Sequence, residues 1–310
     1  MSVEYYAGFD LGGTNLKYGL VNDKGEVSGK GLAPTPATMD EITGLMGGVL
    51  EGLKKEAKGP VRAAGLGIPG LYSRKEKRIL QSPNLPGLDN YDLQAGLGKV
   101  LDVPFWVDND ANLAAYGEWK SGAGRGARSL VLLTVGTGIG SGLILEGELF
   151  QGACGFAGEL GHITVNPEGD KCRCGNQGCL ETEAAAPKIV RNYMDLSRTK
   201  KPLAAEEIYQ RALKGNTAAK KAFAIAGHYL GIGLGIVIQM LNPEKILLGG
   251  GVMTTGDFLM PAAVEEAQRR SYKASFACCS IDRAALGNDA GFMGAAHWAR
   301  EQFLKKRSKA

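Results

Sequence analysis

Short apolar runs that end in glycine-rich turns recur along the chain. The first run, Glu4 to Leu11, is followed by Gly12-Gly13-Thr14 and then by a second apolar run, Leu16 to Val21. Apolar runs of this length, bounded by turn residues, are typical of buried strands. The pattern therefore predicts two strands joined by a tight turn, with Asp10 standing at the turn.

The same strand-turn-strand unit returns near the middle of the chain. Leu130 to Val135 leads into the turn Gly136 to Gly140, and Gly142 to Leu145 follows it. Further apolar strands are predicted at Arg62 to Ile68, Pro104 to Val107, Lys245 to Leu248 and Ser280 to Arg283. Two copies of one unit, each continued by strands and helices, predict a duplicated α/β architecture with a cleft between its halves.

Two helix starts have local signals. Thr38 precedes Glu41 by three residues, which is the spacing of a capping box. A second helix is predicted to begin at Asp108-Asn109-Asp110 and to run toward Trp119.

One segment, Ala222 to Leu241, is apolar enough to raise the question of a membrane span. It carries Gly227, Gly231 and Gly235 at four-residue spacing and runs directly into Asn242-Pro243-Glu244. We interpret it as a buried helix whose glycine face lets a neighbour approach closely.

Composition narrows the classes of function. The chain has 310 residues, and 46 of them are glycine. This share is about twice the usual one of ~7%, which indicates many tight turns. The formal net charge of +4 is matched by four basic residues at the C-terminus, Lys305, Lys306, Arg307 and Lys309. We expect that end to be solvated and frayed. The body of the chain is then about neutral, so neither a nucleic-acid partner nor a membrane partner is expected.

The cysteines indicate a metal site. His162, Cys172, Cys174 and Cys179 bring one imidazole and three sulfurs together within a short stretch, which suits tetrahedral Zn²⁺ of the closed structural kind. The alternative is three reduced thiols in a surface loop. Met1 to Asp10 has no basic region typical of a signal peptide, so we expect a cytoplasmic protein without disulfides. Packing roles are expected for Cys154, Cys278 and Cys279.

Three glycine-rich turns follow apolar strands and could bind phosphate groups through their backbone N–H groups. They are Gly12-Gly13-Thr14, Gly136-Thr137-Gly138 and Gly249-Gly250-Gly251. One such turn is weak evidence, but three of them favour nucleotide binding. The chain has neither a P-loop nor a dinucleotide-binding fingerprint.

Phosphoryl transfer also needs a metal ion and a group that accepts the proton of the nucleophile. Asp10 could hold Mg²⁺ directly or through water, although it could also be an ordinary turn aspartate. Asp110 lies where a strand passes into a helix, and the helix N-terminus would favour its ionised form. Asp110 could equally be a helix N-cap, and the residues alone leave these two roles balanced.

Six motifs in order resemble the ROK family of sugar kinases and repressors. They are Asp10-x-Gly-Gly-Thr14, Asn109-Asp-Ala-Asn112, Gly136-Thr-Gly-Ile-Gly140, Gly158-Glu-Leu-Gly-His162, Cys172-x-Cys-Gly-x-x-Gly-Cys-x-Glu181 and Gly287-Asn-Asp-Ala-Gly291. The match runs from residue 8 to residue 295. One departure is Leu88, which stands where many relatives carry Trp. The segment Leu71-Tyr72-Ser73 also differs from the family's common continuation.

The resemblance implies a hexokinase/actin-like (ribonuclease H-like) ATPase fold with ATP and sugar in the cleft between two domains. We expect a smaller α/β domain at residues 1–120, with a C-terminal helix at 293–310 packing back on it. The larger domain, 121–292, would follow a glycine-rich joint at Ser121 to Ala127 and carry the zinc motif. A homodimer or homotetramer is also implied.

The resemblance assigns roles residue by residue. Asp110 becomes the catalytic base. The predicted sugar-binding residues are Gly70, Asn84, Asn109, Asp110, Glu159, His162 and Glu181. The predicted ATP-binding residues are Asp10, Gly12, Gly13, Thr14, Asn15, Lys17, Thr134, Gly136, Thr137, Gly138, Gly249, Gly250 and Gly251. His162 would bind zinc through one ring nitrogen and face the sugar with the other.

The expected activity is ATP-dependent phosphorylation of a hexose at the 6-hydroxyl, with glucose as the preferred acceptor. An N-acetylhexosamine kinase is the alternative. A sugar-responsive repressor is the rival from another class, but only nine residues precede Asp10, which leaves no room for a helix-turn-helix. A polyphosphate-driven glucokinase is disfavoured by the complete cysteine cluster, and a non-catalytic sugar-binding protein is the least expected.

Overall fold

The computed structural model of the chain describes residues 3–82 and 85–308. The chain forms two compact units. Unit 1 comprises Met1–Gly126, Gly142–Ala157 and Leu286–Ala310, and unit 2 comprises Ala127–Ser141 and Gly158–Ala285. The chain first leaves unit 1 inside the glycine-rich stretch that ends at Ala127. The domain boundaries expected at residues 120 and 292 stay a prediction.

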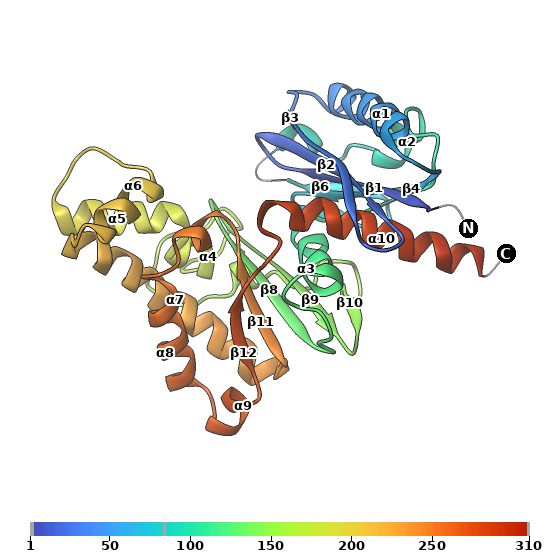
Figure 1. The fold of residues 1–310 in the computed structure, drawn as a ribbon. Coiled ribbons are helices and arrows are strands. Elements are labelled where there is room, and N and C mark those ends of the chain that lie inside the picture. Colours follow the sequence, from blue (N-terminus) through green and yellow to red (C-terminus); the bar gives the residue numbers. More distant parts are fainter. Residues whose placement is uncertain (1–2, 83–84, 309–310) are drawn as a thin grey trace. The chain divides into compact units, whose positions relative to one another are not determined.

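Each half of the chain builds a five-stranded sheet of the same order (Figure 1). The first sheet has the order β3-β2-β1-β4-β7 and the second has the order β10-β9-β8-β11-β12. The strands of the first sheet are β1 (Tyr5–Leu11), β2 (Asn15–Asn22), β3 (Val27–Pro34), β4 (Val61–Ile68) and β7 (Phe105–Asn109). Those of the second are β8 (Leu130–Val135), β9 (Ile139–Leu145), β10 (Glu148–Phe150), β11 (Lys245–Gly249) and β12 (Ser280–Arg283).

In the first sheet β2 is antiparallel to β1, whereas β4 and β7 run parallel to it. In the second sheet β11 runs parallel to both β8 and β12. The matching orders confirm the duplication that the repeated strand-turn-strand unit predicts. A small hairpin in unit 1, β5 (Leu71–Ser73) with β6 (Arg78–Gln81), stands outside both sheets.

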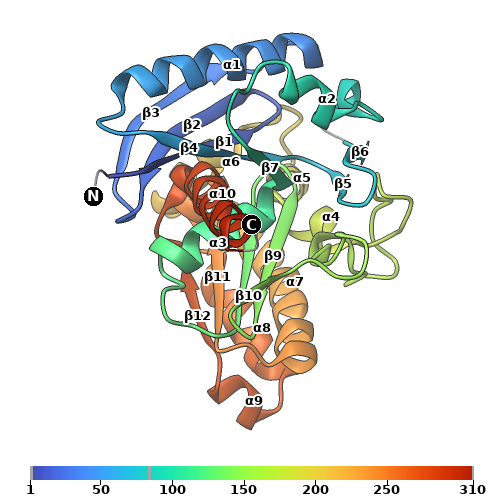
Figure 2. The ribbon, with the colours of Figure 1, turned by 90° about the vertical axis from the view of Figure 1, so that its right-hand side faces the viewer.

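The strand β1 is apolar apart from Asp10 near its end, as expected where helices cover both faces of a sheet. Alternate residues such as Phe9 pack in one core cluster with residues of α1 (Met39–Glu56) and α2 (Leu93–Gly98). On the opposite face Tyr6 packs against α10 (Ala290–Arg307). Figure 2 shows α1 and α10 on opposite sides of this sheet. The capping box that opens α1 is confirmed at Thr38 and Glu41.

Glycines let α10 lie at backbone distance from its neighbours. A Cβ at Gly8 of β1 would lie 1.8 Å from the carbonyl oxygen of Phe292. A Cβ at Gly294 would lie 1.7 Å from the carbonyl oxygen of Leu113, in α3 (Asp110–Ser121). Any larger residue at either position would push the helix away from the sheet or from α3.

The basic C-terminal residues are not frayed as the sequence suggested. Lys305, Lys306 and Arg307 form the last turn of α10, and Lys305 Nζ lies 2.8 Å from Glu301. Cations in the last turn of a helix interact favourably with its dipole, which explains why the helix continues into this segment. Lys309 lies outside the described residues.

Unit 2 carries most of the remaining helices. They are α4 (Leu180–Ala184), α5 (Ala186–Ser197), α6 (Ala205–Leu213), α7 (Thr217–Leu241), α8 (Met260–Arg270) and α9 (Lys273–Ala277). Short 3₁₀ turns lie at Pro86–Leu88, Leu160–His162, Gly251–Thr255 and Gly287–Asp289.

Among the described residues, α7 is the one helix long and apolar enough to cross a membrane, and 56% of its apolar window is buried. Its glycines face α8: a Cβ at Gly227 would lie 2.3 Å from the carbonyl oxygen of Leu259, and one at Gly231 would lie 2.5 Å from that of Ala263. The interpretation of this segment as a packed core helix with a glycine face is therefore confirmed.

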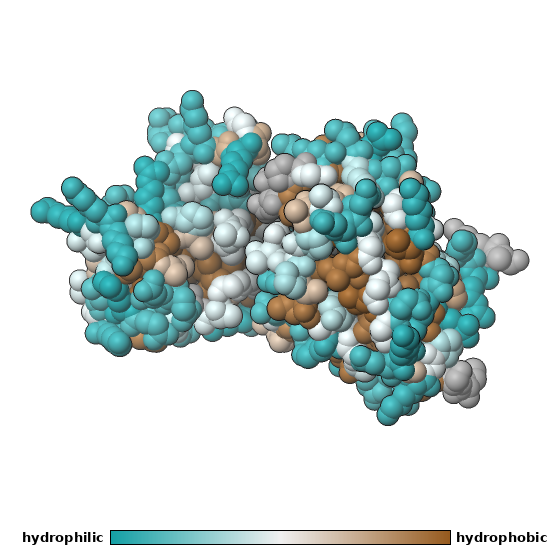
Figure 3. Space-filling model, turned by 90° about the horizontal axis from the view of Figure 1, so that it is seen from above, coloured by the Kyte–Doolittle hydropathy of each residue, from teal (hydrophilic) through white to brown (hydrophobic). Residues whose placement is uncertain are grey.

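Large apolar side chains that remain exposed are spread over several elements. Leu32 lies on β3, Met240 on α7, and Tyr272 just before α9. The face of the molecule seen in Figure 3 shows hydrophilic side chains projecting at its edges, with apolar residues between them.

Candidate active site

The carboxyl ends of three parallel strands bring the candidate residues of unit 1 to one edge of the first sheet. The strand register pairs Asp10 of β1 with Gly67 of β4, and Gly67 with Asp108 of β7. Gly70 follows β4, and Asp110 follows β7. Crevices at such strand ends are where open α/β sheets bind their ligands. The structure thus places four of the predicted residues, Asp10, Gly70, Asn109 and Asp110, at neighbouring strand ends.

Asp10 is a partly buried carboxylate with one cationic partner. Its Oδ2 lies 3.5 Å from Lys17 Nζ on the paired strand, and 16% of its side chain is exposed. Burial raises the pKa of Asp10, and the Lys17 ammonium opposes that rise. Gly291, in the first turn of α10, leaves room for the carboxylate, because a Cβ there would lie 2.5 Å from Asp10 Oδ2.

The turn between β1 and β2 exposes Gly13 and Thr14. The N–H of Gly12 donates to the carbonyl oxygen of Asn15 at 2.9 Å, which closes the turn. The hydroxyl of Thr35 donates to the carbonyl oxygen of Gly12 at 2.7 Å. The backbone of this turn is therefore held by neutral hydrogen bonds on the side of β3.

The N-cap of α3 is Asn109 and not Asp110. Asn109 Oδ1 accepts from the N–H groups of Ala111 (2.9 Å) and Asn112 (3.1 Å), while its Nδ2 donates to the carbonyl oxygen of Gly70 at 3.2 Å. Asp110 is the first residue of the helix, and its Oδ1 accepts from the N–H of Ala111 at 2.9 Å. The helix N-terminus favours the ionised form of its carboxylate.

The remaining predicted residues of unit 1 have mixed outcomes. Gly70 has φ 103°, and a Cβ there would lie 2.2 Å from the carbonyl oxygen of Gln81, so the turn requires glycine. Asn84 lies outside the described residues. Leu88 is buried in the core cluster that includes residues of α1 and α2.

In unit 2, two glycine turns lie side by side at the ends of β8 and β11. The register pairs Thr134 with Gly249, so the turn after Val135 and the turn after Gly249 are neighbours. Gly250 has φ 88°, and a Cβ there would lie 2.4 Å from the carbonyl oxygen of Val135. Only glycine allows these two turns to approach so closely.

Glu181 supports the turn after β8, which sequence reasoning missed. Its Oε2 accepts from the N–H of Ile139 at 2.9 Å, and a Cβ at Gly138 would lie 2.4 Å from that oxygen. The N–H of Ala186 donates to the carbonyl oxygen of Gly136 at 2.9 Å. The glycine at position 138 was a signal that something approaches the turn, but nothing in the sequence named Glu181 as the partner.

Glu159 and His162 lie together at a 3₁₀ turn in unit 2. Glu159 Oε2 is 4.0 Å from His162 Nε2, and their side chains are 45% and 31% exposed. Burial raises the pKa of Glu159, His162 lowers it, and the Glu181 carboxylate raises it. That coupling places Glu181 within electrostatic range of Glu159, so the structure brings the three predicted sugar residues of unit 2 into one neighbourhood.

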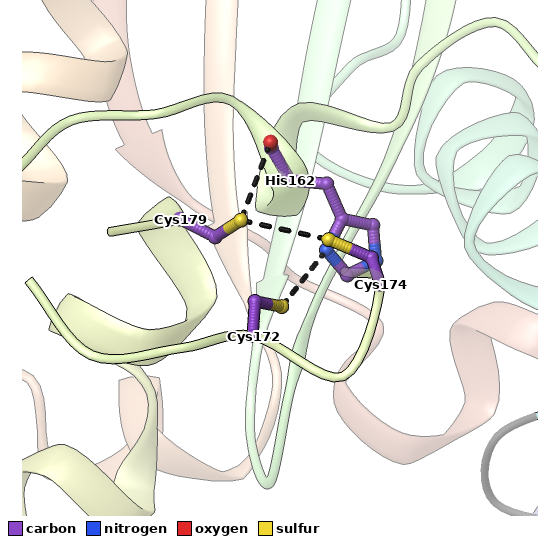
Figure 4. Close-up of side chains that lie close together, drawn as sticks. All are labelled: His162, Cys172, Cys174 and Cys179. Carbon is purple, nitrogen blue, oxygen red and sulfur yellow. Dashed lines mark hydrogen bonds between the residues drawn. The ribbon is translucent and has the colours of Figure 1, made fainter. Parts of the chain in front are cut away.

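The predicted zinc ligands converge in unit 2 (Figure 4). One ligand atom from each of His162, Cys172, Cys174 and Cys179 lies within 4.8 Å of the others. Cys174 Sγ lies 3.7 Å from Cys179 Sγ, and Cys172 Sγ lies 3.6 Å from His162 Nδ1. Tetrahedral zinc with bonds of about 2.0 to 2.3 Å has ligands about 3.3 to 3.8 Å apart, so these four residues fit the ion. The three sulfurs and the imidazole converge as a zinc site requires, and the zinc itself stays a prediction.

Sequence reasoning also missed the role of Asp108. Its side chain is 3% exposed, and its Oδ1 accepts from the N–H of Asn109 and from Asn112 Nδ2, both at 2.9 Å. Its Oδ2 accepts from Gln151 Nε2. Burial raises the pKa of Asp108, and these donors oppose that rise. An aspartate at the end of a buried strand was the only signal of this network.

Known proteins match this chain over almost its whole length. The chain matches the ROK family over residues 6–302. It is 34% identical to a glucokinase of Halalkalibacterium halodurans, over 97% of this chain and 97% of that protein. It is 30% identical to a xylose repressor of Caldicellulosiruptor bescii, over 93% of this chain and 76% of the repressor.

A solved structure of a ROK family glucokinase from Streptomyces griseus, in complex with glucose and AMPPNP, is similar with a TM-score of 0.84 and 29% identity. The alignment covers 96% of this chain and 99% of that chain. The duplicated hexokinase/actin-like fold expected from the sequence is thereby confirmed. A match of this extent shows that the chain belongs to the ROK family.

Proposed function

We propose that this chain is an ATP-dependent hexose kinase that phosphorylates the 6-hydroxyl group, with glucose as the preferred acceptor. The observation that carries the proposal is the position of Asp110, a carboxylate at the start of α3 beside Asn109 and Gly70. The 34% identity to a glucokinase over 97% of this chain supports a hexose as the substrate. A sugar kinase needs one such carboxylate to accept the proton of the hydroxyl nucleophile.

In unit 1 we assign Asp110 the role of general base. The sugar would be held there by Asn109, Gly70 and Asn84. The Nδ2 of Asn109 already bonds Gly70, so this pair forms a preformed wall beside the base. Asp10 would bind Mg²⁺ together with the phosphates, and Lys17, at 3.5 Å, would balance its charge when the ion is absent. Magnesium, when bound, would neutralise charge that develops on the phosphates.

The phosphate groups of ATP would be bound by backbone N–H groups. The proposed residues are Gly12, Gly13, Thr14, Asn15, Thr134, Gly136, Thr137, Gly138, Gly249, Gly250 and Gly251. The close packing of the turns after β8 and β11 supports this assignment, because two adjacent glycine turns present N–H groups to one anion.

In unit 2 we assign Glu159, His162 and Glu181 to the sugar hydroxyls. We further propose one structural zinc held by His162, Cys172, Cys174 and Cys179. Four protein ligands leave no open position, so zinc would supply rigidity and no Lewis-acid chemistry. His162 Nδ1 faces Cys172, and His162 Nε2 is the atom nearest Glu159. The ligand set thereby fixes the ring whose other nitrogen is offered to the sugar.

The free thiols suit a reducing compartment, and we infer a cytoplasmic location. A homodimer or homotetramer stays a prediction. The ROK family also includes the xylose repressor, but the presence of Asp110 as a candidate base favours the kinase.

The proposal is tested by steady-state kinetics with ATP and Mg²⁺ on glucose, mannose, fructose, N-acetylglucosamine and N-acetylmannosamine. We expect glucose to give the highest kcat/KM, because carboxylates and an imidazole built to bond hydroxyls reject an analogue that masks one. A ratio of kcat/KM for glucose over N-acetylmannosamine below one would move the assignment to the N-acetylhexosamine kinase. No transfer to any of the five sugars would refute the kinase assignment.

A further inference from the structure

Gln151 joins two charged side chains that the proposed mechanism leaves without a task. Its side-chain Nε2 donates to Asp108 Oδ2, and its Oε1 accepts from Arg74 Nη1. Gln151 is 8% exposed and Asp108 is 3% exposed, so their contact is shielded from water, whereas Arg74 at the other end of the junction is exposed. All three residues belong to unit 1.

The chemistry of the junction specifies an amide. An ionised carboxylate only accepts hydrogen bonds, and a guanidinium only donates them. A neutral side chain that carries both a donor and an acceptor can therefore bridge Asp108 and Arg74. The other oxygen of Asp108 accepts from the N–H of Asn109 and from Asn112 Nδ2. Loss of the Gln151 donor would leave a buried carboxylate short of one hydrogen bond.

The junction connects three segments at the sheet edge that carries the proposed base. Asp108 directly precedes Asn109 and Asp110, and its bond to Asn112 reaches the first turn of α3. Arg74 follows β5, the strand that begins after Gly70.

Gln151 itself opens a turn that covers residues 151–157. The N–H of Ala157 donates to the carbonyl oxygen of Gln151 at 3.1 Å and closes this turn. A Cβ at Gly155 would lie 3.3 Å from the carbonyl oxygen of Tyr72, so the turn packs directly on β5. After Ala157 the chain enters unit 2 and reaches Glu159.

We propose that Gln151 is a positioning residue for sugar phosphorylation: it holds the 151–157 turn and Arg74 to the strand end that presents Asn109 and Asp110. This inference rests on the proposed function, because it concerns the same base and the same sugar. Alignment of the acceptor depends on small distances, and a displacement of about 1 Å can lower the rate about 10²-fold. Gln151 acts through Asp108 and touches no substrate.

The first test is Gln151→Met, which keeps the length of the side chain and removes both hydrogen bonds. We expect kcat with glucose to fall about 10-fold and the KM for glucose to rise, with the KM for ATP unchanged within about twofold. Gln151→Glu keeps the bond to Arg74 and sets a second carboxylate against Asp108, so it should be at least as impaired. The matched control is Gln94→Met, on an exposed glutamine of α2, which should leave all three constants unchanged.

A double-variant cycle of Arg74 and Gln151 separates a positioning role from a purely structural one. Arg74→Ala alone should lower kcat, and in the Gln151→Met background it should add nothing, because Arg74 acts through Gln151. Lys77→Ala, an exposed cation of the same hairpin, is the control. Additive effects of Arg74 and Gln151 would overturn the proposal. So would a lowered melting temperature of Gln151→Met with unchanged kinetic constants.

Failure of the proposed function gives a different result. If the wild-type chain phosphorylates no hexose, the kinase assignment fails. Hydrogen exchange of residues 151–157 would then still report the junction: faster exchange in Gln151→Met than in Gln94→Met supports it, and equal exchange refutes it.

Discussion

The first and second sheets share one strand order but present different chemistry at their carboxyl ends. In unit 1 carboxylates stand at the strand ends, because Asp10 lies near the end of β1 and Asp110 directly follows β7. At the equivalent end of β8 the chain carries the uncharged Thr134, and β11 ends in Gly249. The carboxylates of unit 2, such as Glu181, come from segments outside its sheet.

The hydrogen bonds that hold the turn after β1 and the turn after β8 also differ in charge. A neutral hydroxyl, that of Thr35, holds the carbonyl of Gly12 in unit 1. In unit 2 an ionisable carboxylate, that of Glu181, accepts from the N–H of Ile139. The duplicated fold thus supplies glycine turns in both halves. The carboxylates lie at strand ends in one half, and in the other they come from the inserted segment that carries the proposed zinc ligands. Hydrogen bonds that involve a charged partner are about twice as strong as neutral ones.

The largest effect is expected at the strand-end carboxylate. Asp110→Asn is nearly isosteric but cannot accept a proton, so turnover should fall by about 10²–10⁴-fold with the fold and ATP binding kept. The measurement is kcat with glucose, beside a melting curve. Asp23→Asn, in an exposed turn of unit 1, is the control. Wild-type turnover in Asp110→Asn would show that the base lies elsewhere.

The second expectation concerns acid stability, which should differ between the units. In unit 1 burial is the main cause that lowers the pKa of His297 to about 4 from 6.5, and the Lys120 and Arg300 charges add to it. Between these values the unfolded chain binds a proton that the folded chain does not bind. The free energy of unfolding of unit 1 should therefore decrease as pH falls from 6.5 to 4, by up to about 3 kcal/mol, and then stay level.

Tryptophan fluorescence can measure this loss selectively, because Trp106, Trp119 and Trp298 all belong to unit 1. Urea unfolding from pH 7 to 4 should show the decrease in the wild type, and His297→Asn should flatten it. In unit 2 the Arg269 guanidinium is the main cause that lowers the pKa of Glu266 to about 2, so its contribution should be lost only as pH falls from about 4.5 toward 2. An unchanged slope in His297→Asn would contradict the assignment.

A third effect should follow from loss of the metal. Purified protein should contain one zinc per chain by elemental analysis. Cys174→Ser should lower the melting temperature and reduce glucose affinity by about 10–100-fold, because His162 loses its fixed orientation. Cys278→Ser is the control, because Cys278 is exposed and lies outside the ligand set. The packing roles expected for Cys154 and Cys278 are wrong, since both are exposed, whereas Cys279 is buried. Active enzyme without zinc would refute the metal assignment.

The smallest effects compare the two turn supports directly. Glu181→Ala removes the bond to Ile139 and should lower kcat/KM for both substrates by about 10-fold. Glu181→Gln keeps an acceptor at that position, so it should retain more ATP affinity than the alanine variant. Thr35→Val breaks only the neutral bond to Gly12, and we expect a change below about threefold. Equal losses in Thr35→Val and Glu181→Ala would remove the distinction between the two turns.

Much of the fold could be predicted, because the sequence signals for its strands and helices lie within the elements themselves. The apolar run of β1 and the capping box at Thr38 depend on residues near in sequence, and both are confirmed. The glycine face of α7 was also predictable, since a four-residue spacing places Gly227 and Gly231 on one side of a helix.

The unpredicted features depend on partners distant in sequence. The sequence leaves open which residue of Asn109-Asp110 caps α3, because both are good caps and the choice depends on where β7 ends. The bond from Gln151 to Asp108 crosses 43 positions, and that from Glu181 to Ile139 crosses 42. The hydrophobic periodicity of a strand or helix does not predict pairs so far apart in sequence. They appear only once the strand register is fixed.

The return of α10 to the first sheet has a consequence for the order of synthesis. On the ribosome β1 and β4 emerge early, but α10, which covers their Gly8 and Gly65 face, emerges only after every strand of both sheets. Until then one face of the nascent sheet, with Tyr6 and Ala63, has no cover. Unit 2, which ends at Ala285, can complete its packing first. The N-terminal half of this chain is thus the later one to mature, and a stalled or prematurely terminated product would expose an apolar sheet face to quality control.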